Sequence, residues 1–225
     1  MAPAAFTPPD AVRIFAVVSF LIPVAYIWSL PRLAAKDEFV VPYDEHKYVF
    51  PSISAYITNA HATGAMAATF IPSMIMMWIN ALYNNFRLIT IAALIIYQVG
   101  FSAFLMLNVD WKPKLHGGAV FVMSCGAAVH CYSMFDSAYE NPLLAVVLAA
   151  GTVAFTVVVI LAIFEPAFAR SKHYFYLAEA VGLTALCSYV PIMMWSQSKG
   201  RRHTVNFITD SMTQVVRRIR GIKTK

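Results

Sequence analysis

The stretch that decides the fold is PLLAVVLAAGTVAFTVVVILAIF at residues 142–164, which contains no Asp, Glu, Lys or Arg. A helix rises about 1.5 Å per residue, so a run of this length crosses the ~30 Å hydrocarbon core of a bilayer. Five other runs are comparably long and apolar, and the six predicted spans are residues 11–30, 62–82, 88–107, 116–135, 142–164 and 174–195. The sequence therefore predicts an all-α, polytopic membrane protein built as a six-transmembrane-helix bundle.

The composition supports a membrane environment. Hydrophobic residues make up 60% of the chain and charged residues 12%, whereas soluble domains have about 45–50% apolar and about 25% charged residues. The formal net charge is +6, but the cations stand at span ends and in the C-terminal tail. This placement predicts anionic lipid headgroups, not nucleic acid, as the partner. Cys125, Cys131 and Cys187 lie in or beside apolar runs, which predicts small buried side chains instead of a disulfide framework.

Two parts of the chain follow from the positions of the spans. Residues 1–197 are predicted to form the transmembrane domain, in which residues 31–61 are the only long polar loop, and residues 198–225 form a basic tail. In the tail, apolar side chains recur at helical spacing at Val205, Ile208, Met212, Val215, Val216 and Ile219. Two interpretations remain open, an amphipathic helix lying on anionic lipid and an unstructured basic tail.

The orientation is predicted from parity and charge. An even number of spans places both termini on one side, and that side carries the larger number of Lys and Arg because of the tail. Both termini are therefore predicted to be cytosolic and the 31–61 loop lumenal. The short loops alone favour the reverse orientation.

Polar residues gather on the predicted lumenal side of the bundle. Each of them lies near the start of an even-numbered span or just after the end of the third span. They are Ser52, Ser54, His61, Asp110, His116 and Glu179. An ionisable group inside a span is costly unless it is paired or hydrated, so Glu179 most needs a partner. We predict His116 and Glu179 as a catalytic pair, with His116 as the base and Glu179 orienting it, and Ser52, Ser54, His61 and Asp110 as lipid contacts. The alternative is that Glu179 and His116 form hydrogen bonds that only fix helix packing.

No metal or cofactor is predicted. His130 lies 14 residues after His116, which is ~21 Å along a helix, so the two cannot share a metal ion. Histidine boxes, zinc-ligand spacings, a nucleophile elbow and a phosphate loop are absent from the sequence. Spacing alone therefore names no reaction. A transporter is disfavoured because Glu179 is the one acid well inside a span and no internal repeat is visible.

Three stretches of the chain stand out together, and they are Phe50-Pro51-Ser52-Ile53-Ser54, then His116 with Ala119-Val120-Phe121-Val122 and the Gly126 to His130 segment, and Tyr176-Leu177-Ala178-Glu179. These stretches resemble a six-span membrane family that contains the damage-regulated autophagy modulators and the Golgi factor for GPI-anchor lipid remodelling. The Pro-Ser-x-Ser form favours the GPI-remodelling branch, and Ala55 stands where the autophagy branch has an aspartate. The tail is not covered by this resemblance.

The resemblance implies a lipid-handling protein of the Golgi or endoplasmic reticulum, with the lysosome as the alternative. Its implied partners are membrane lipids, GPI-anchored proteins or an acyl donor, and a second membrane protein. Two functions remain open, which are acyl transfer on a lumenal-leaflet lipid and a non-enzymatic modulator or scaffold that binds lipid.

Overall fold

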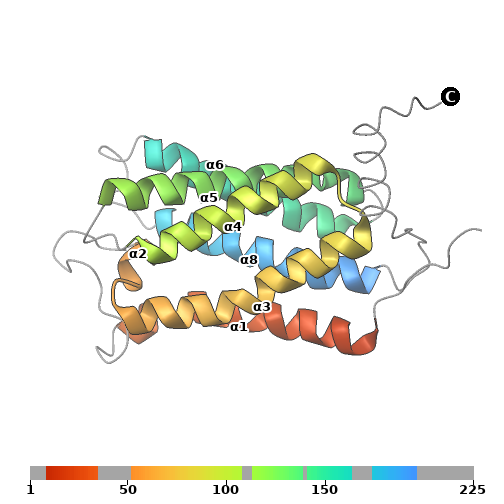
Figure 1. Cartoon of the computed structure of the whole chain (residues 1–225), viewed down its shortest axis with the longest axis horizontal. Helices are drawn as coiled ribbons and strands as arrows, with labels where there is room; N and C mark the ends of the chain where they lie inside the picture. Colours follow the sequence, from red (N-terminus) through yellow and green to blue (C-terminus); the bar gives the residue numbers. More distant parts are fainter. Residues whose placement is uncertain (1–8, 35–51, 108–112, 139–140, 164–173, 197–225) are drawn as a thin grey trace, which may run out of the picture.

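The computed structural model describes residues 9–34, 52–107, 113–138, 141–163 and 174–196, and these residues form helices and short turns without a strand. The helices are α1 (Asp10–Ala34), α2 (Ile53–Tyr56), α3 (Ala60–Asn84), α4 (Leu88–Met106), α5 (Pro113–Ser133), the 3₁₀ helix η1 (Phe135–Ala138), α6 (Pro142–Ile163) and α8 (Tyr174–Ser196). Six of them are long and apolar enough to cross a bilayer. The predicted all-α, six-span fold is confirmed (Figure 1).

The helix boundaries follow local sequence signals. Proline suits the first turn of a helix because its missing N–H would be unpaired there, so α5 begins at Pro113, earlier than predicted. Asn59 caps α3 by accepting a hydrogen bond from the Ala62 amide at 2.7 Å. Asn85 ends α3 in the left-handed conformation with φ of 51°, and the chain turns directly into α4. Asparagine tolerates this conformation better than most residues.

Pro23, Pro72 and Pro191, which the sequence places within predicted spans, lie inside α1, α3 and α8, and Pro31 also lies inside α1, near its C-terminal end. The described helices continue through all four positions. Inside a bundle, neighbouring helices and local adjustments can satisfy the backbone groups that proline frees. These residues are therefore accommodated without ending a span.

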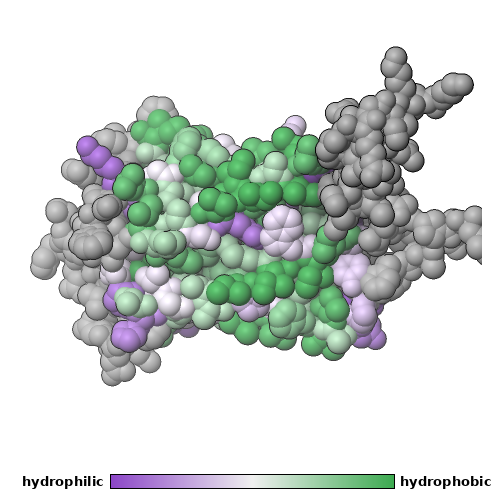
Figure 2. Space-filling model, viewed as in Figure 1, coloured by the Kyte–Doolittle hydropathy of each residue, from purple (hydrophilic) through white to green (hydrophobic). Residues whose placement is uncertain are grey.

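The outer surface of the bundle is apolar over its middle part. Figure 2 shows hydrophobic residues covering most of this face between two more polar ends. Large side chains such as Leu88, Val99, Val146 and Val153 are more than 60% exposed. A soluble monomer rarely exposes large contiguous apolar patches, whereas lipid tails solvate them well. The chain is therefore an integral membrane protein that crosses the bilayer several times.

Helix α8 lies at the centre of the bundle (Figure 1). It packs between α6 and α1, and the series continues from α6 to α5 and α4 and from α1 to α3. In its apolar window 72% of the residues are buried, against 28–50% in the other five long helices. The central position explains how the last span carries Glu179, which is 2% exposed and faces protein instead of lipid.

Helices α4 and α5 approach each other most closely at two glycines. A Cβ placed on Gly126 would lie 2.5 Å from the Tyr97 amide nitrogen, and one on Gly100 would lie 2.6 Å from the Met123 nitrogen. Small residues allow such backbone contact, and this is a main source of helix association in membranes. The contact fixes the rotation of α5 and therefore the positions of its histidines.

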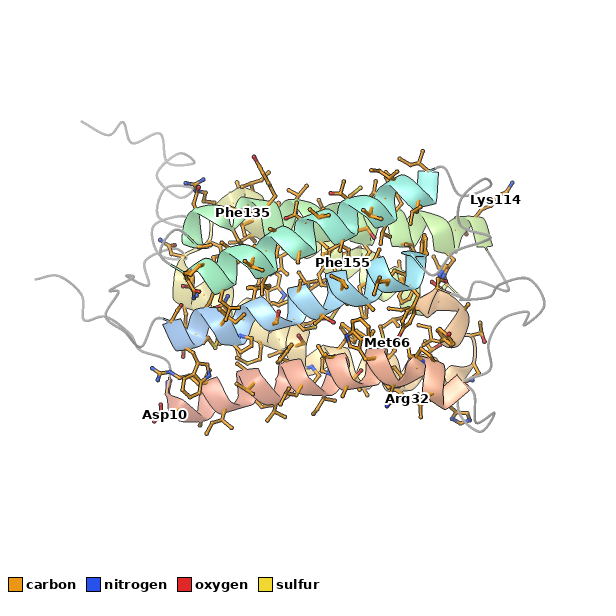
Figure 3. The ribbon with its side chains drawn as sticks, turned by 180° about the vertical axis from the view of Figure 1, so that it is seen from behind. Asp10, Arg32, Met66, Lys114, Phe135 and Phe155 are labelled. Carbon is orange, nitrogen blue, oxygen red and sulfur yellow. The ribbon has the colours of Figure 1, made fainter. Side chains whose placement is uncertain are left out.

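The two ends of the bundle carry different residues. Asp10 and Phe135 lie at one end, whereas Arg32 and Lys114 lie at the other, close to α2 (Figure 3). The starts of α3, α5 and α8 are at the α2 end, which agrees with the alternation of span direction. The loop between α1 and α2 before residue 52 and the predicted tail helix lie outside the described residues.

Candidate functional site

The predicted lipid contacts occupy different environments at the α2 end. Ser54 is 5% exposed inside α2, and Ser52 is half-buried at the position before α2, where its side chain makes no capping bond. His61 is exposed in the first turn of α3. Asp110 lies outside the described residues. Of this group, Ser52 and His61 present polar atoms at the surface of the described part.

Glu179 connects α8 to α2. Its side chain is buried, with 2% exposure, and its Oε2 accepts a hydrogen bond from the Ile53 amide at 2.8 Å. The first amides of a helix have no partner within the helix, so a carboxyl group is a suitable acceptor there. Among the described residues no Lys, Arg or His forms an ion pair with Glu179. The partner that the sequence required for Glu179 is therefore a backbone amide of the long loop.

Aromatic residues surround this contact. The Tyr176 ring lies edge-on to the Tyr56 ring at 5.6 Å and to the Trp28 ring at 6.5 Å between centroids. The Tyr176 hydroxyl donates to the carbonyl oxygen of Ile27 at 2.7 Å. Burial raises the pKa of Tyr56, so its phenol stays neutral. We call Trp28, Ile53, Tyr56, Tyr176 and Glu179 the Glu179 cluster. It holds α2 between α1 and α8.

Two further hydrogen bonds fix the surroundings of the cluster. The Tyr26 hydroxyl donates to the Ala62 carbonyl oxygen at 2.8 Å, which joins α1 to α3. The Trp28 indole N–H donates to the Thr184 hydroxyl at 3.0 Å, which joins α1 to α8. Inside a bilayer such interhelical bonds are worth about 0.6–2 kcal/mol each. These bonds therefore hold the three spans α1, α3 and α8 together around the cluster.

His116 lies at the same end of the bundle but contacts different groups. Its ring is 6% exposed and stacks at a tilt against Phe104, with 5.1 Å between centroids. Nδ1 bonds the Leu107 carbonyl oxygen, and because that oxygen only accepts, Nδ1 carries the proton. Nε2 is then an acceptor, and it has no partner in the described part of the chain.

The predicted His116–Glu179 pair is not formed. His116 is held by the end of α4 and Glu179 by the start of α2, and no hydrogen bond links the two within the residues that the structure describes. The reason is topological. Helix α5 packs on α4 and α6, so His116 turns toward α4, whereas α8 packs on α1 and meets α2. The alternating direction of the spans predicts that both residues lie at one end of the bundle, but it does not predict which helices are neighbours there.

A second buried polar cluster lies around His130 and was not predicted. His130 is fully buried, and its Nδ1 donates to the Thr90 carbonyl oxygen at 2.9 Å. Its Nε2 accepts from the Tyr189 hydroxyl at 3.0 Å, and the Phe86 ring lies edge-on at 6.1 Å. These bonds join α4, α5 and α8. Both ring nitrogens are used, so this neutral histidine has a packing role. The sequence contains the three residues but no signal that pairs them.

The cysteines are free thiols, with Cys131 and Cys187 buried, as predicted, and Cys125 half-buried. Within the described ranges, no three His, Cys, Asp or Glu side chains are grouped as metal ligands would be. Within the described residues, the groups at the α2 end are therefore the Glu179 carboxyl, serine hydroxyls, aromatic rings and the imidazoles of His61 and His116. These groups can bind hydroxyls or accept a proton.

Fold and site together define the class of this protein, which is a multi-pass integral membrane protein with a buried carboxyl group, that of Glu179, at one end of its bundle. Comparisons with protein-family models, with curated proteins and with solved structures find no match to this chain. The family suggested by the three sequence stretches stays a prediction.

Proposed function

We propose that this protein handles membrane lipid in an endomembrane, binding the polar part of a lumenal-leaflet lipid at the α2 end of the bundle. The observation that carries the proposal is the hydrogen bond between the Ile53 amide and Glu179. It brings together two of the three stretches on which the family resemblance depends, although they lie 126 residues apart in the chain. The two rings Tyr56 and Tyr176 meet at the same junction.

The residues at this end suit a hydroxyl-rich headgroup. Ser52 and His61 offer polar atoms at the surface, and the buried His116 Nε2 is an acceptor with no hydrogen-bond partner among the described residues. The exposed apolar faces of the surrounding spans would hold the acyl chains. By the resemblance, the lipid is the anchor of GPI-linked proteins, the compartment is the Golgi or endoplasmic reticulum, and the termini are cytosolic. The non-enzymatic modulator of the autophagy type remains the alternative for the same lipid site.

A second candidate function, acyl transfer, is favoured by the free lone pair of His116. An acceptor hydroxyl of a bound lipid would give its proton to Nε2 as its oxygen attacks the acyl carbonyl. The acyl donor's leaving group would then take a proton as its bond to the acyl carbon breaks. The Leu107 carbonyl would hold the Nδ1–H and keep Nε2 basic. In this mechanism Glu179 positions α2 and does not orient His116.

The test is lipid analysis of GPI-anchored proteins in cells that lack this gene and are complemented with variants. We expect altered anchor acyl chains in the deletion, restored by the wild type. Glu179→Gln keeps an oxygen acceptor for the Ile53 amide but removes the acid, and His116→Ala removes the free nitrogen. Tyr189→Phe, which perturbs a buried hydrogen bond elsewhere, is the matched control.

The outcomes of this test separate the possibilities. Loss of remodelling in Glu179→Gln at normal abundance, with activity retained in Tyr189→Phe, supports the lipid site. Loss of remodelling in His116→Ala as well supports acyl transfer. If that variant can still be crosslinked to lipid but no longer remodels it, His116 acts in catalysis and not in lipid binding. Normal anchors in the deletion strain contradict the GPI assignment, and normal activity of both site variants contradicts the site.

A further inference from the structure

A buried arginine lies at the opposite end of the bundle from the Glu179 cluster. Arg13 is in the first turn of α1, which begins at Asp10, and Figure 3 shows Asp10 at the end away from Arg32 and α2. The Arg13 side chain is 10% exposed. A cation inside or at the edge of a span is costly without compensation, so its partners need to be identified.

The partners of Arg13 compensate it incompletely. Nη1 lies 3.3 Å from Asp10 Oδ1, and that aspartate side chain is 89% exposed. Because the aspartate is solvated, this i,i+3 pair offsets only part of the cost of burying the Arg13 charge. The guanidinium carbon is 6.0 Å from the centroid of the Trp195 ring. Nε is buried and makes no hydrogen bond to the described residues. A buried donor without an acceptor costs about 1–3 kcal/mol.

The other described arginine at this end differs. Arg87 forms a 2.6 Å ion pair with Asp136, and both side chains are about 70% exposed. Arg87 therefore has a close partner and ready access to water. Arg13 stands at the same end of the bundle, but its bond to Asp10 is longer, at 3.3 Å, and its side chain is only 10% exposed. The contrast marks Arg13 as the position where an external anion would gain most.

The surroundings of Arg13 fit the phosphate of a lipid. A guanidinium binds phosphate through parallel N–H donors, and the positive end of the α1 dipole adds attraction. Trp195 is an aromatic residue of the kind that marks the headgroup region. Next along α1, Ile14, Phe15 and Val18 are exposed, with 59%, 46% and 42% of their surface accessible. We propose that Arg13 and the start of α1 form a binding site for an anionic phospholipid.

In this site the phosphate bonds the guanidinium of Arg13, including Nε, and competes with Asp10 for Nη1. Asp10 can turn into solvent, where its charge is screened. The acyl chains lie against the exposed apolar face of α1. A free phosphate ion has no acyl chains to place against that apolar face, so the ligand proposed for this site is a lipid. The sequence predicts this end to face the cytosol, where anionic lipids are concentrated.

Native mass spectrometry of the full-length chain in neutral detergent tests the site. Phosphatidylserine is titrated against the wild type and against Arg13→Gln, Arg13→Lys and Arg87→Gln. We expect Arg13→Gln to weaken phosphatidylserine binding about tenfold. Arg13→Lys keeps the positive charge but loses the parallel N–H donors of the guanidinium, so we expect it to weaken phosphatidylserine binding by an intermediate amount. Arg87→Gln, which removes a cation at the same end, should change the affinity less than about twofold.

The tail is present in every variant, so any lipid binding by the tail is common to all of them. If Arg13→Gln fails to fold, the phosphatidylserine affinities of Arg13→Lys and Arg87→Gln are compared instead. Equal affinities of the Arg13 and Arg87 variants would overturn the proposal. Phosphatidylcholine binding as tightly as phosphatidylserine would overturn the requirement for an anion, and inorganic phosphate displacing the lipid at equal concentration would overturn the lipid assignment.

Discussion

Replacing Gly126 with alanine tests the contact on which the positions of the α5 histidines depend. The new Cβ would lie 2.5 Å from the Tyr97 nitrogen, 2.9 Å from its Cα and 3.0 Å from the Ala93 oxygen. All three neighbours are backbone atoms, so no side-chain rotation relieves the contact. An ordinary van der Waals contact needs 3.4 Å or more, so α4 and α5 must separate by almost 1 Å at this point.

The cost has three parts. Overpacking against backbone costs about 1–3 kcal/mol. His130 lies one helical turn after Gly126, and its 2.9 Å bond to Thr90 crosses the same interface. Separation of the helices would break that bond and leave buried polar groups unpaired, at a cost of about 1–3 kcal/mol. Alanine offsets part of this because it favours the helix over glycine by about 1 kcal/mol. The net destabilisation is about 3 kcal/mol.

Thermal unfolding in detergent, followed by size-exclusion chromatography of the heated protein, measures this loss. For a chain of this size the expected decrease in Tm is about 6–12 °C. Gly118→Ala is the matched control, because it is on the same helix and a Cβ there meets nothing within 4 Å. We expect Gly118→Ala to unfold at or slightly above the wild-type temperature. A Gly126→Ala protein within 2 °C of wild type, or an equal loss in Gly118→Ala, would refute the reasoning.

Three other predictions address the polar network, the orientation and the tail. Tyr189→Phe removes the donor to His130 Nε2 and should lower the unfolding free energy by about 1–2 kcal/mol, measured in the same thermal assay; no change would mean that water replaces the hydroxyl. A tag at residue 45 should be protected from protease in sealed membranes while a C-terminal tag is digested, and the opposite result would invert the orientation. A peptide of residues 205–222 should gain helical circular dichroism with phosphatidylserine vesicles and lose it in high salt, whereas no gain would favour an unstructured tail.

The spans were predictable because their signal is local. A bilayer requires each crossing helix to satisfy its own backbone, so about 20 apolar residues in a row are sufficient to identify one. The predicted six spans differ from the observed helices only near their ends. Proline explains one difference, since Pro113 begins α5 at a position that hydropathy alone excludes.

The partners of the polar residues were not predictable, because they depend on contacts between spans and not on the local sequence. Parity correctly placed His116 and Glu179 at one end, but a hydrogen bond depends on which helices are neighbours. Lipid is as apolar as the side chains, so hydropathy does not state which face of a span contacts protein. The glycine contacts between α4 and α5 and the central position of α8 decide that His116 meets Leu107.

By itself, the sequence determined that this chain crosses a membrane six times and that one acid, Glu179, needs a partner inside it. Only the tertiary structure decided that this partner is the Ile53 amide and that His130 joins three spans. It also decided that the Arg13 Nε is buried without a hydrogen-bond partner among the described residues. The physical reason is the range of the interactions. Transfer from water to lipid depends on each segment alone, whereas hydrogen bonds between helices depend on rotations and neighbours set by packing along the whole bundle.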